Sequence, residues 1–139
     1  MAANTQPISP IAPAESWNTT PLVGANTALD GTGTVGTIIT AGPNGTRVPR
    51  VRIVHRGANV ATVLRIFENN GLTNATPGNN NLIAEITIAT VAALSQVAAS
   101  IFYDLWLNII LKPGYKLLYT IGTAVATGHS VSAPDAGDY

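Results

Sequence analysis

The sequence predicts an all-β fold, an antiparallel β-sandwich of jelly-roll type that carries an extended N-terminal arm. Short apolar runs recur along the chain with a period of two residues, and each run ends at a cluster of Gly, Asn or Pro. Alternation with β-branched residues is typical of half-buried strands, and many short strands divided by turns indicate a sandwich or a barrel. Because about eight strands are expected, a jelly roll is the first choice and a simpler Greek-key sandwich the second.

Residues 1–21 are predicted to form the arm, and residues 22–139 the single sandwich domain. Three prolines spaced three residues apart follow the polyproline II repeat and exclude a regular helix or a central strand. These prolines are Pro7, Pro10 and Pro13. Large apolar side chains gain nothing in a solvated tail, so Ile8, Ile11 and Trp17 are expected to hold the arm against its own domain or a neighbour.

The strands of the domain follow from the alternating runs. They are expected at residues 35–40, 47–56, 60–68, 82–89, 101–111, 115–121 and 129–133. Only residues 90–100 are compatible with a helical turn. The Asn-rich loop at residues 73–81 joins two strands without an apolar anchor, so it is expected to be an exposed tip that tolerates insertion between Asn79 and Asn80.

The glycines Gly31, Gly33 and Gly36 match the G-x-G-x-x-G pattern of dinucleotide-binding proteins. That pattern needs a helix whose N-terminus holds the pyrophosphate, whereas a β-branched run follows here. The match is therefore interpreted as accidental. We expect the first two glycines to form a turn and Gly36 to mark a bulge or a close backbone contact within a strand.

Charged residues make up only 10% of the chain and the net charge is zero, against about 25% charged residues in an average soluble protein. A neutral surface rich in Thr, Asn and Ala favours association. We therefore expect a homo-oligomer, with a trimer as the first choice. An extracellular β-domain explains the composition equally well.

No catalytic, cofactor-binding or metal-binding residue is predicted, and the chain is not expected to be an enzyme. Cysteine is absent, the motif G-x-S-x-G is missing, and neither His55 nor His129 has a second ligand at metal-binding spacing. No secretory signal is visible, and the longest apolar stretch, at residues 101–111, is shorter than the ~20 residues of a membrane helix. No membrane or nucleic-acid partner is expected.

Five of the seven basic residues lie between Asp30 and Glu68, a stretch without any acidic residue. They are Arg47, Arg50, Arg52, Arg56 and Arg65. These arginines either form a docking face for an acidic protein surface or pair with Glu68, Glu85 and Asp104 on neighbouring strands. We expect partial pairing together with a protein contact. Nucleic acid is disfavoured because no aromatic residues are interleaved and the chain is neutral.

Three blocks of the chain resemble small virion proteins of tailed bacteriophages, in particular capsid decoration or cement proteins. The blocks are "NTALDGTGTVGTIITAGPNGTRVPRVRI", "VATVLRIFENNG" and "LNIILKPGYKLLYTIGTAVATG", at roughly residues 26–71 and 107–128. The resemblance implies a β-sandwich located on the virion, where jelly-roll trimers bind the outside of the capsid. It implies the major capsid protein, or another virion protein, as the partner.

The residues expected to contact that partner come from the arm and from the arginine-rich strand. They are Pro7, Ile8, Pro10, Ile11, Trp17, Arg47, Arg50 and Arg52. One alternative is a carbohydrate- or receptor-binding module of a tail or baseplate, with an aromatic platform drawn from Trp17, Tyr103, Trp106, Tyr115 and Tyr119, although alternation places most of these in the core, Trp106 included. A virion-borne hydrolase is the third alternative.

Overall fold

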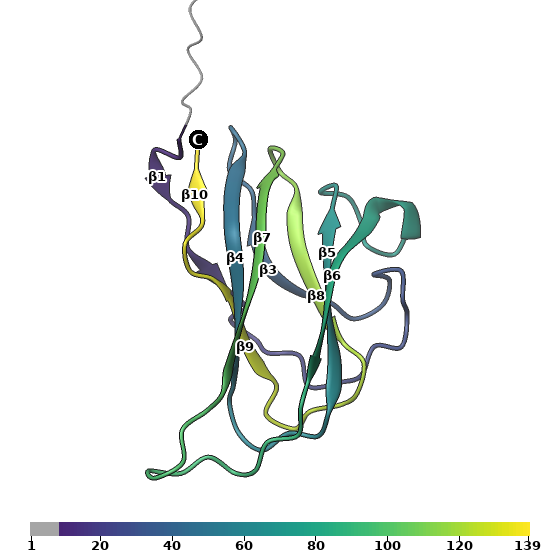
Figure 1. The fold of residues 1–139 in the computed structure, drawn as a ribbon. Helices are drawn as coiled ribbons and strands as arrows, with labels where there is room; N and C mark the ends of the chain where they lie inside the picture. The colour runs from purple at the N-terminus through teal and green to yellow at the C-terminus, as the bar shows by residue number, and fades with distance from the viewer. Residues whose placement is uncertain (1–8) are drawn as a thin grey trace, which may run out of the picture.

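The computed structural model describes residues 9–139, and within that range the regular structure is almost entirely antiparallel β-sheet (Figure 1). One sheet contains β1 (Ala12–Pro13), β2 (Ser16–Trp17), β4 (Thr46–His55), β7 (Phe102–Leu111), β9 (His129–Ala133) and β10 (Gly137–Asp138). The other contains β3 (Gly36–Thr40), β5 (Thr62–Asn69), β6 (Asn80–Ile88) and β8 (Lys116–Ile121). The predicted all-β, antiparallel architecture is confirmed.

Strand pairing in the two sheets is nested. The segment of β1 and β2 pairs with the segment of β10 and β9, β3 pairs with β8, β4 with β7, and β5 with β6. Two further pairings complete the sheets: β4 also pairs with β9 and β10, and β5 also pairs with β8. As a result β4 and β9 lie inside the first sheet, while β7 is one of its edges.

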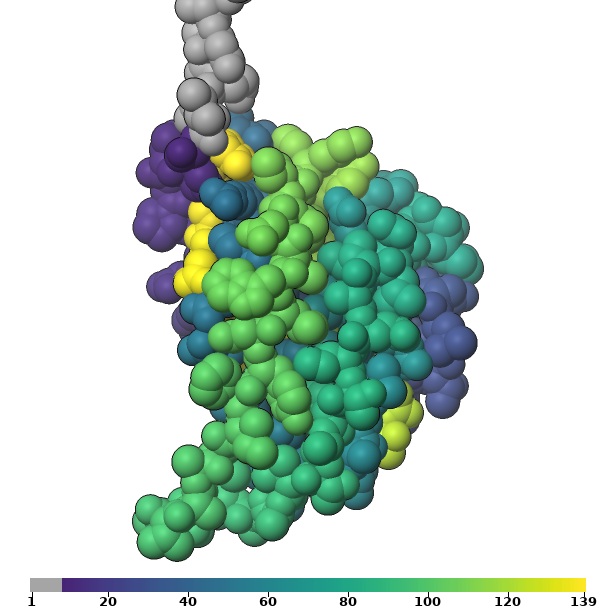
Figure 2. Space-filling model, viewed as in Figure 1, coloured from purple at the N-terminus to yellow at the C-terminus, as the bar shows by residue number. Residues whose placement is uncertain are grey.

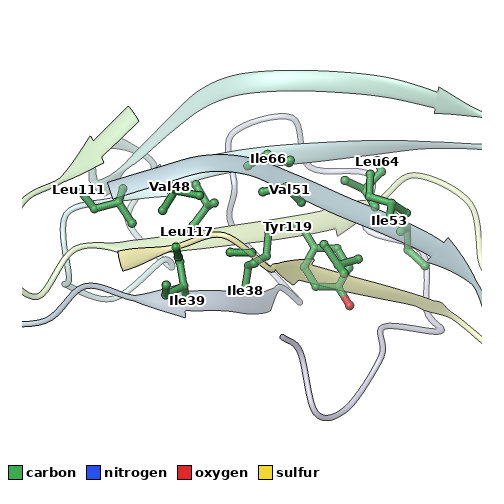
Figure 3. Close-up of a cluster of buried hydrophobic side chains, with 14 of the residues drawn as sticks. Ile38, Ile39, Val48, Val51, Ile53, Leu64, Ile66, Leu111, Leu117 and Tyr119 are labelled. Atoms are coloured by element: carbon green, nitrogen blue, oxygen red, sulfur yellow. The ribbon is translucent and has the colours of Figure 1, made fainter. Parts of the chain in front are cut away.

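Both sheets contribute to one hydrophobic core. Alternate side chains of β4, β5 and β9 are buried, and Figure 3 shows core side chains gathered between the strands. The labelled core residues include Val48, Val51, Ile53, Leu64, Ile66, Leu111, Leu117 and Tyr119. Each side chain of this size contributes about 1.5–3 kcal/mol when it leaves water, so burial fixes which face of these three strands points outward. β8 differs, because it is buried on both faces over residues 117–121.

Pro49 lies in the middle of β4, where a proline would usually break the backbone pairing. The β7 register shifts between Val48 and Arg50, where β7 carries an extra residue and Asn108 adopts a positive φ of 49°. On the other side of β4, pairing with β10 ends at Arg47 and pairing with β9 begins at Arg52. Pro49 therefore sits where neither neighbour needs its missing N–H group.

Residues 11–18 run in extended form along the C-terminal segment of the chain. The backbone amides of Ile11, Ala14 and Asn18 donate to carbonyl oxygens of that segment over 2.8, 2.9 and 3.0 Å. This strip is thus hydrogen-bonded to its own domain. Pro7 and Ile8 lie outside the described residues, and an arm that extends as a unit to residue 21 stays a prediction.

The glycine-rich turn behaves as expected. Gly31 and Gly33 both have φ near +78°, and a Cβ atom on Gly36 would lie 2.2 Å from the ring of Tyr119. The close contact predicted at Gly36 is present. It places the phenol ring of β8 directly over the start of β3.

The loop at residues 73–81 is largely exposed, as the sequence predicts, but asparagine side chains anchor it to a second loop. The side-chain amide of Asn74 donates to the carbonyl oxygens of Gly31 and Gly33 over 3.1 and 2.9 Å, and that of Asn80 donates to Asp30 over 3.1 Å. The loop also contains a short 3-10 helix, η1 (Pro77–Asn79). Asparagine side chains therefore bind two loops together that are far apart in sequence.

The connection between β6 and β7 contains no helical turn, in contrast to the prediction for residues 90–100. Its tip folds back through paired backbone hydrogen bonds between Ser95 and Ala98. Figure 1 shows this connection projecting away from both sheets, and Val97 at its tip is 96% exposed. Its Ala-rich composition is compatible with a helical turn, but the backbone of Val91 pairs with Asn59 and the tip pairs with itself, so the segment is held in extended form.

Candidate functional site

Arginine and aromatic side chains share the outer face of the first sheet. Arg50 and Arg52 on β4 lie opposite Trp106 and Asp104 on β7, and Phe102 lies one step further along that strand. We call this set of five residues the arginine–aromatic face. The Arg52 guanidinium lies 4.5 Å from the Phe102 ring centroid, and that of Arg50 lies 5.4 Å from the Trp106 centroid. Contacts of this kind favour a fixed arrangement of cation and ring.

Acidic side chains neutralise the two arginines of this face. Arg52 donates two hydrogen bonds of 2.8 Å to Asp104, and Arg50 donates one of 2.8 Å to the same carboxylate and pairs with Asp135. The hydrogen bonds from Arg52, together with the positive charge of Arg50, hold the pKa of Asp104 below its usual range. Two cations and two carboxylates thus leave this face without net charge, and the expected partial pairing is present.

Trp106 is not a core residue, and that expectation was wrong. Its side chain is 66% exposed on the outer face, beside Phe102 at 55% and Ile110 at 61%. The inner face of β7 is formed instead by its odd-numbered residues. These are Tyr103, Leu105, Leu107, Ile109 and Leu111. Both faces of this strand are apolar, so alternation could not reveal which one faces the core.

The sandwich-like core is incompletely covered along its β6–β7 side. In the described chain β6 pairs only with β5, and β7 pairs only with β4, so each presents a free backbone edge. Figure 2 shows the surfaces of β6 and β7 next to each other on this side of the molecule. Their inward side chains are only partly buried. They include Ile83, Ile86, Leu105, Leu107 and Ile109.

A shallow groove borders β2 on the outer face of the same sheet. It has a volume of about 340 Å³ and is lined by Glu15, Ser16, Trp17, Ser130, Ser132 and Pro134. We call it the Trp17 groove. Trp17 is 59% exposed and lies in register with Ser132, which in turn pairs with Arg52. Trp17, Ser132, Arg52 and Asp104 thus form one row across four paired strands, and the groove lies at the Trp17 end of that row.

A buried polar contact fixes the position of Trp17. The neighbouring Asn18 donates through Nδ2 to the Tyr119 hydroxyl over 2.7 Å and accepts the backbone N–H of Val131 over 2.7 Å. The backbone N–H of Leu22 donates to the same hydroxyl over 3.1 Å. Tyr119 belongs to β8, so these hydrogen bonds tie the β2 strip to the opposite sheet and fix the backbone that presents the indole.

The other residues expected to bind a partner are dispersed. Pro10 packs over Gly137, and Ile11 is 73% exposed beside it. Arg47 is exposed opposite Ile110 on β7. Arg65 lies in the second sheet and pairs with Glu85 at 2.6 Å, so the five arginines do not form one basic patch. Pro7 and Ile8 lie outside the described residues.

The two histidines face each other across β4 and β9. Their ring centroids are 5.1 Å apart, and the Tyr103 ring lies 5.9 Å from that of His55. Burial, and then the charge of His55, lowers the pKa of His129 to about 4, and burial lowers the pKa of His55. Within residues 9–139, no cluster of three His, Cys, Asp or Glu side chains is placed to hold a metal ion. In the same range no helix has the length and hydropathy of a membrane span.

Comparisons with known family models, curated proteins and solved structures found no match to this chain. Sequence reasoning identified Trp17, Arg50 and Arg52, but it missed Phe102 and the serines of the Trp17 groove. The alternation in residues 129–133 did place Ser130 and Ser132 opposite the buried His129, Val131 and Ala133. Their meeting with Trp17 depends on strand pairing between residues more than a hundred positions apart, which no local pattern predicts.

Proposed function

We propose that this chain is a structural protein of a phage virion, a capsid decoration or cement protein that binds the outer shell and stabilises it. Two observations support the proposal. Three sequence blocks resemble small virion proteins of tailed bacteriophages, and the outer face of the first sheet exposes large apolar side chains. In this role the major capsid protein, or another virion protein, is the partner. Many identical weak contacts over a shell supply avidity without a deep pocket.

We also infer that the sandwich is a jelly roll. If β1 with β2, and β9 with β10, each count as one bent strand, the chain has eight strands whose pairing is first with eighth, second with seventh, third with sixth and fourth with fifth. Such nesting is what two interlocked Greek keys produce. This supports the architecture that the resemblance implies.

The observation that carries the docking proposal is a group of exposed apolar side chains on the outer face of β7. Five of the twelve large apolar side chains that are exposed in residues 9–139 lie between residues 97 and 110. Phe102, Trp106 and Ile110 belong to β7, and Val97 and Ile101 belong to the connection before it. Exposed apolar side chains that gather on one strand are typical of interaction surfaces, and interfaces enrich aromatic residues beside arginine. We assign the three residues of β7 to the contact with the shell or with another subunit.

Binding to particles that lack this protein tests the proposal. We expect Trp106→Ser to weaken binding at least about tenfold, since buried aromatic anchors dominate interfaces. Leu29→Ser is the matched control, because Leu29 is also 66% exposed but lies in a loop outside the first sheet. The neutralised arginines predict a weak salt dependence. Unchanged binding of Trp106→Ser would contradict this assignment.

The N-terminal arm remains a competing attachment site and needs its own variant. Deletion of residues 2–8 leaves the described strand β1 in place, so folding is retained and only the arm is tested. Loss of particle binding in this deletion, with normal binding by Trp106→Ser, assigns attachment to the arm. The opposite result assigns it to β7.

A carbohydrate- or receptor-binding module is the second candidate function. It is favoured by the outward position of both tryptophans, since Trp17 and Trp106 are 59% and 66% exposed. An exposed indole is a large, rigid contact surface with an apolar body. Binding of the purified protein to host cells, measured beside binding to shells, separates the two candidates.

A further inference from the structure

We propose that the Trp17 groove binds a neutral pyranose sugar. This inference rests on the second candidate function, the carbohydrate-binding module, and is independent of capsid attachment. It names the site and the class of ligand that the second candidate leaves open. The ligand class follows from one exposed aromatic ring, the hydroxyl groups of two serines on the same face, and the sign of the one charge in the groove.

The Trp17 ring is available for stacking and, unlike the other two exposed aromatic residues of the same sheet, has no arginine over it. Phe102 and Trp106 each have an arginine guanidinium over one face of the ring, at 4.5 and 5.4 Å from the ring centroid. Among residues 9–139, no cation lies over the Trp17 indole, which is 59% exposed. The C–H face of a pyranose ring is flat and apolar, so it can occupy an uncovered indole and remove both surfaces from water.

The polar lining of the groove matches the hydroxyl groups of a sugar. Two serine side chains, Ser130 and Ser132, share the outer face with Trp17, and in the described part of the chain neither hydroxyl makes a hydrogen bond to another protein group. Ser16 pairs with the buried Ala133, so its side chain points to the opposite face of the sheet. A serine hydroxyl both donates and accepts, and the Glu15 carboxylate accepts from two directions. This combination suits the alternating donors and acceptors of a polyol.

Charge selects a neutral sugar over an acidic one. Glu15 is the only ionisable side chain that lines the groove. Arg52 lies one strand away, beside Ser132, but Asp104 holds its guanidinium through two hydrogen bonds. A sugar carboxylate would therefore meet the Glu15 carboxylate without a compensating cation. Uronic and sialic acids are disfavoured, and neutral hexoses are preferred.

The groove also has room for more than one sugar unit. A second groove, of about 460 Å³, shares residues 15–17 with the first and continues toward β3. Besides Glu15 and Ser16, its polar lining residues are Thr37, Thr40 and Asp138. Both volumes fall in the range of small-molecule sites, about 300–1,000 Å³. An oligosaccharide whose terminal ring stacks on Trp17 can extend its next ring across β2 into this second groove.

Titration with methyl glycosides tests the inference. The probes are the methyl pyranosides of glucose, galactose and mannose, with methyl glucuronide as the acidic comparison. We expect at least one neutral glycoside to shift the Trp17 indole N–H resonance with saturable, millimolar affinity, and the glucuronide to bind at least fivefold more weakly. Trp17→Ala removes binding, and Ser132→Ala weakens it about fivefold, the effect of one neutral hydrogen bond.

Leu29→Ala is the matched control, because it removes an exposed apolar side chain outside the first sheet and should leave sugar affinity unchanged. Trp106→Ala tests whether the second exposed indole is the stacking ring instead. Three outcomes overturn the inference: no neutral glycoside perturbs Trp17 at tens of millimolar, Trp17→Ala binds as the wild type does, or Trp106→Ala abolishes binding. Ser132→Ala reports on the groove even if Trp17→Ala does not fold. Shell binding is measured separately, so failure here leaves the capsid proposal unaffected.

Discussion

At the scale of single residues, the hydroxyl of Tyr119 joins the two sheets. It accepts hydrogen bonds from Asn18 Nδ2 and from the Leu22 backbone amide. Tyr119→Phe leaves both donors without this partner in a buried site, so we expect a loss of about 1–3 kcal/mol in the free energy of unfolding. Urea denaturation measures it. A smaller loss would mean that water replaces the hydroxyl.

The buried histidine pair predicts acid sensitivity. No described residue supplies a hydrogen-bond partner to any of the four ring nitrogens of His55 and His129. The pKa of His129 falls from 6.5 in the unfolded chain to about 4 in the fold. The unfolded state therefore binds more protons between these values, and stability falls as pH drops from about 7 to 4, by about 3 kcal/mol from His129.

Thermal unfolding measured across this pH range checks the prediction. His129→Leu replaces the imidazole by an apolar side chain of similar volume and should flatten the dependence above pH 4. Asp104 does not interfere, because the hydrogen bonds from Arg52 and the charge of Arg50 hold its pKa below its usual range. An identical pH profile in the wild type and in His129→Leu would show that other groups cause the acid sensitivity.

At the scale of elements, the two exposed connections respond differently to insertion. Asparagine side chains bind the loop at residues 73–81 to the turn at residues 30–33, so a short peptide inserted between Asn79 and Asn80 breaks several hydrogen bonds. We expect a loss of at least about 2 kcal/mol, at about 1 kcal/mol for each bond. Differential scanning calorimetry measures it.

The matched insertion lies between Gln96 and Val97, at the tip of the projecting connection. Val97 is 96% exposed there, so the thermal midpoint should remain nearly unchanged. Equal effects at the two sites would contradict this ranking of the loops.

Strand positions were readable from sequence because alternation and turn residues are local signals. The seven predicted strands correspond to β3 through β9 with small shifts at their ends. The short strands β1, β2 and β10 were missed, since two residues carry no periodicity. Likewise, the hydrogen bonds that anchor Asn74 and Asn80 were not predicted, because their partners at residues 30–33 lie far away in sequence.

At the scale of the whole molecule, the open β6–β7 side predicts self-association. Natural monomers protect long edge strands with lysine or proline, and the free edge of β7 has neither. We expect sedimentation at micromolar concentration to show a species larger than 14.3 kDa, with a trimer as the first choice. Ile110→Lys should shift it toward the monomer, and Leu29→Lys should not. A wild type that remains monomeric would contradict this prediction.

The candidate sites were only partly predictable from sequence because they form where segments far apart in the chain pair with one another. Trp17 was identified from its unusual position in a polar segment, and the arginines from their clustering in sequence. The neutralisation of Arg50 by Asp104 and Asp135 required β4, β7 and the turn between β9 and β10 to meet. The groove beside Trp17 required the two ends of the described chain to pair.

That last pairing has a kinetic consequence. Figure 1 shows β1 beside β10, and β2 hydrogen-bonds to β9. The first strands of the sheet to be synthesised therefore pair with the last. During synthesis at about 5–20 residues per second, the N-terminal strip has no native partner until residues 129–138 leave the ribosome. Contacts of such high sequence separation fold slowly. The Trp17 groove therefore cannot form before residues 130–134 are available, and a ribosome stalled before residue 129 carries a chain without it.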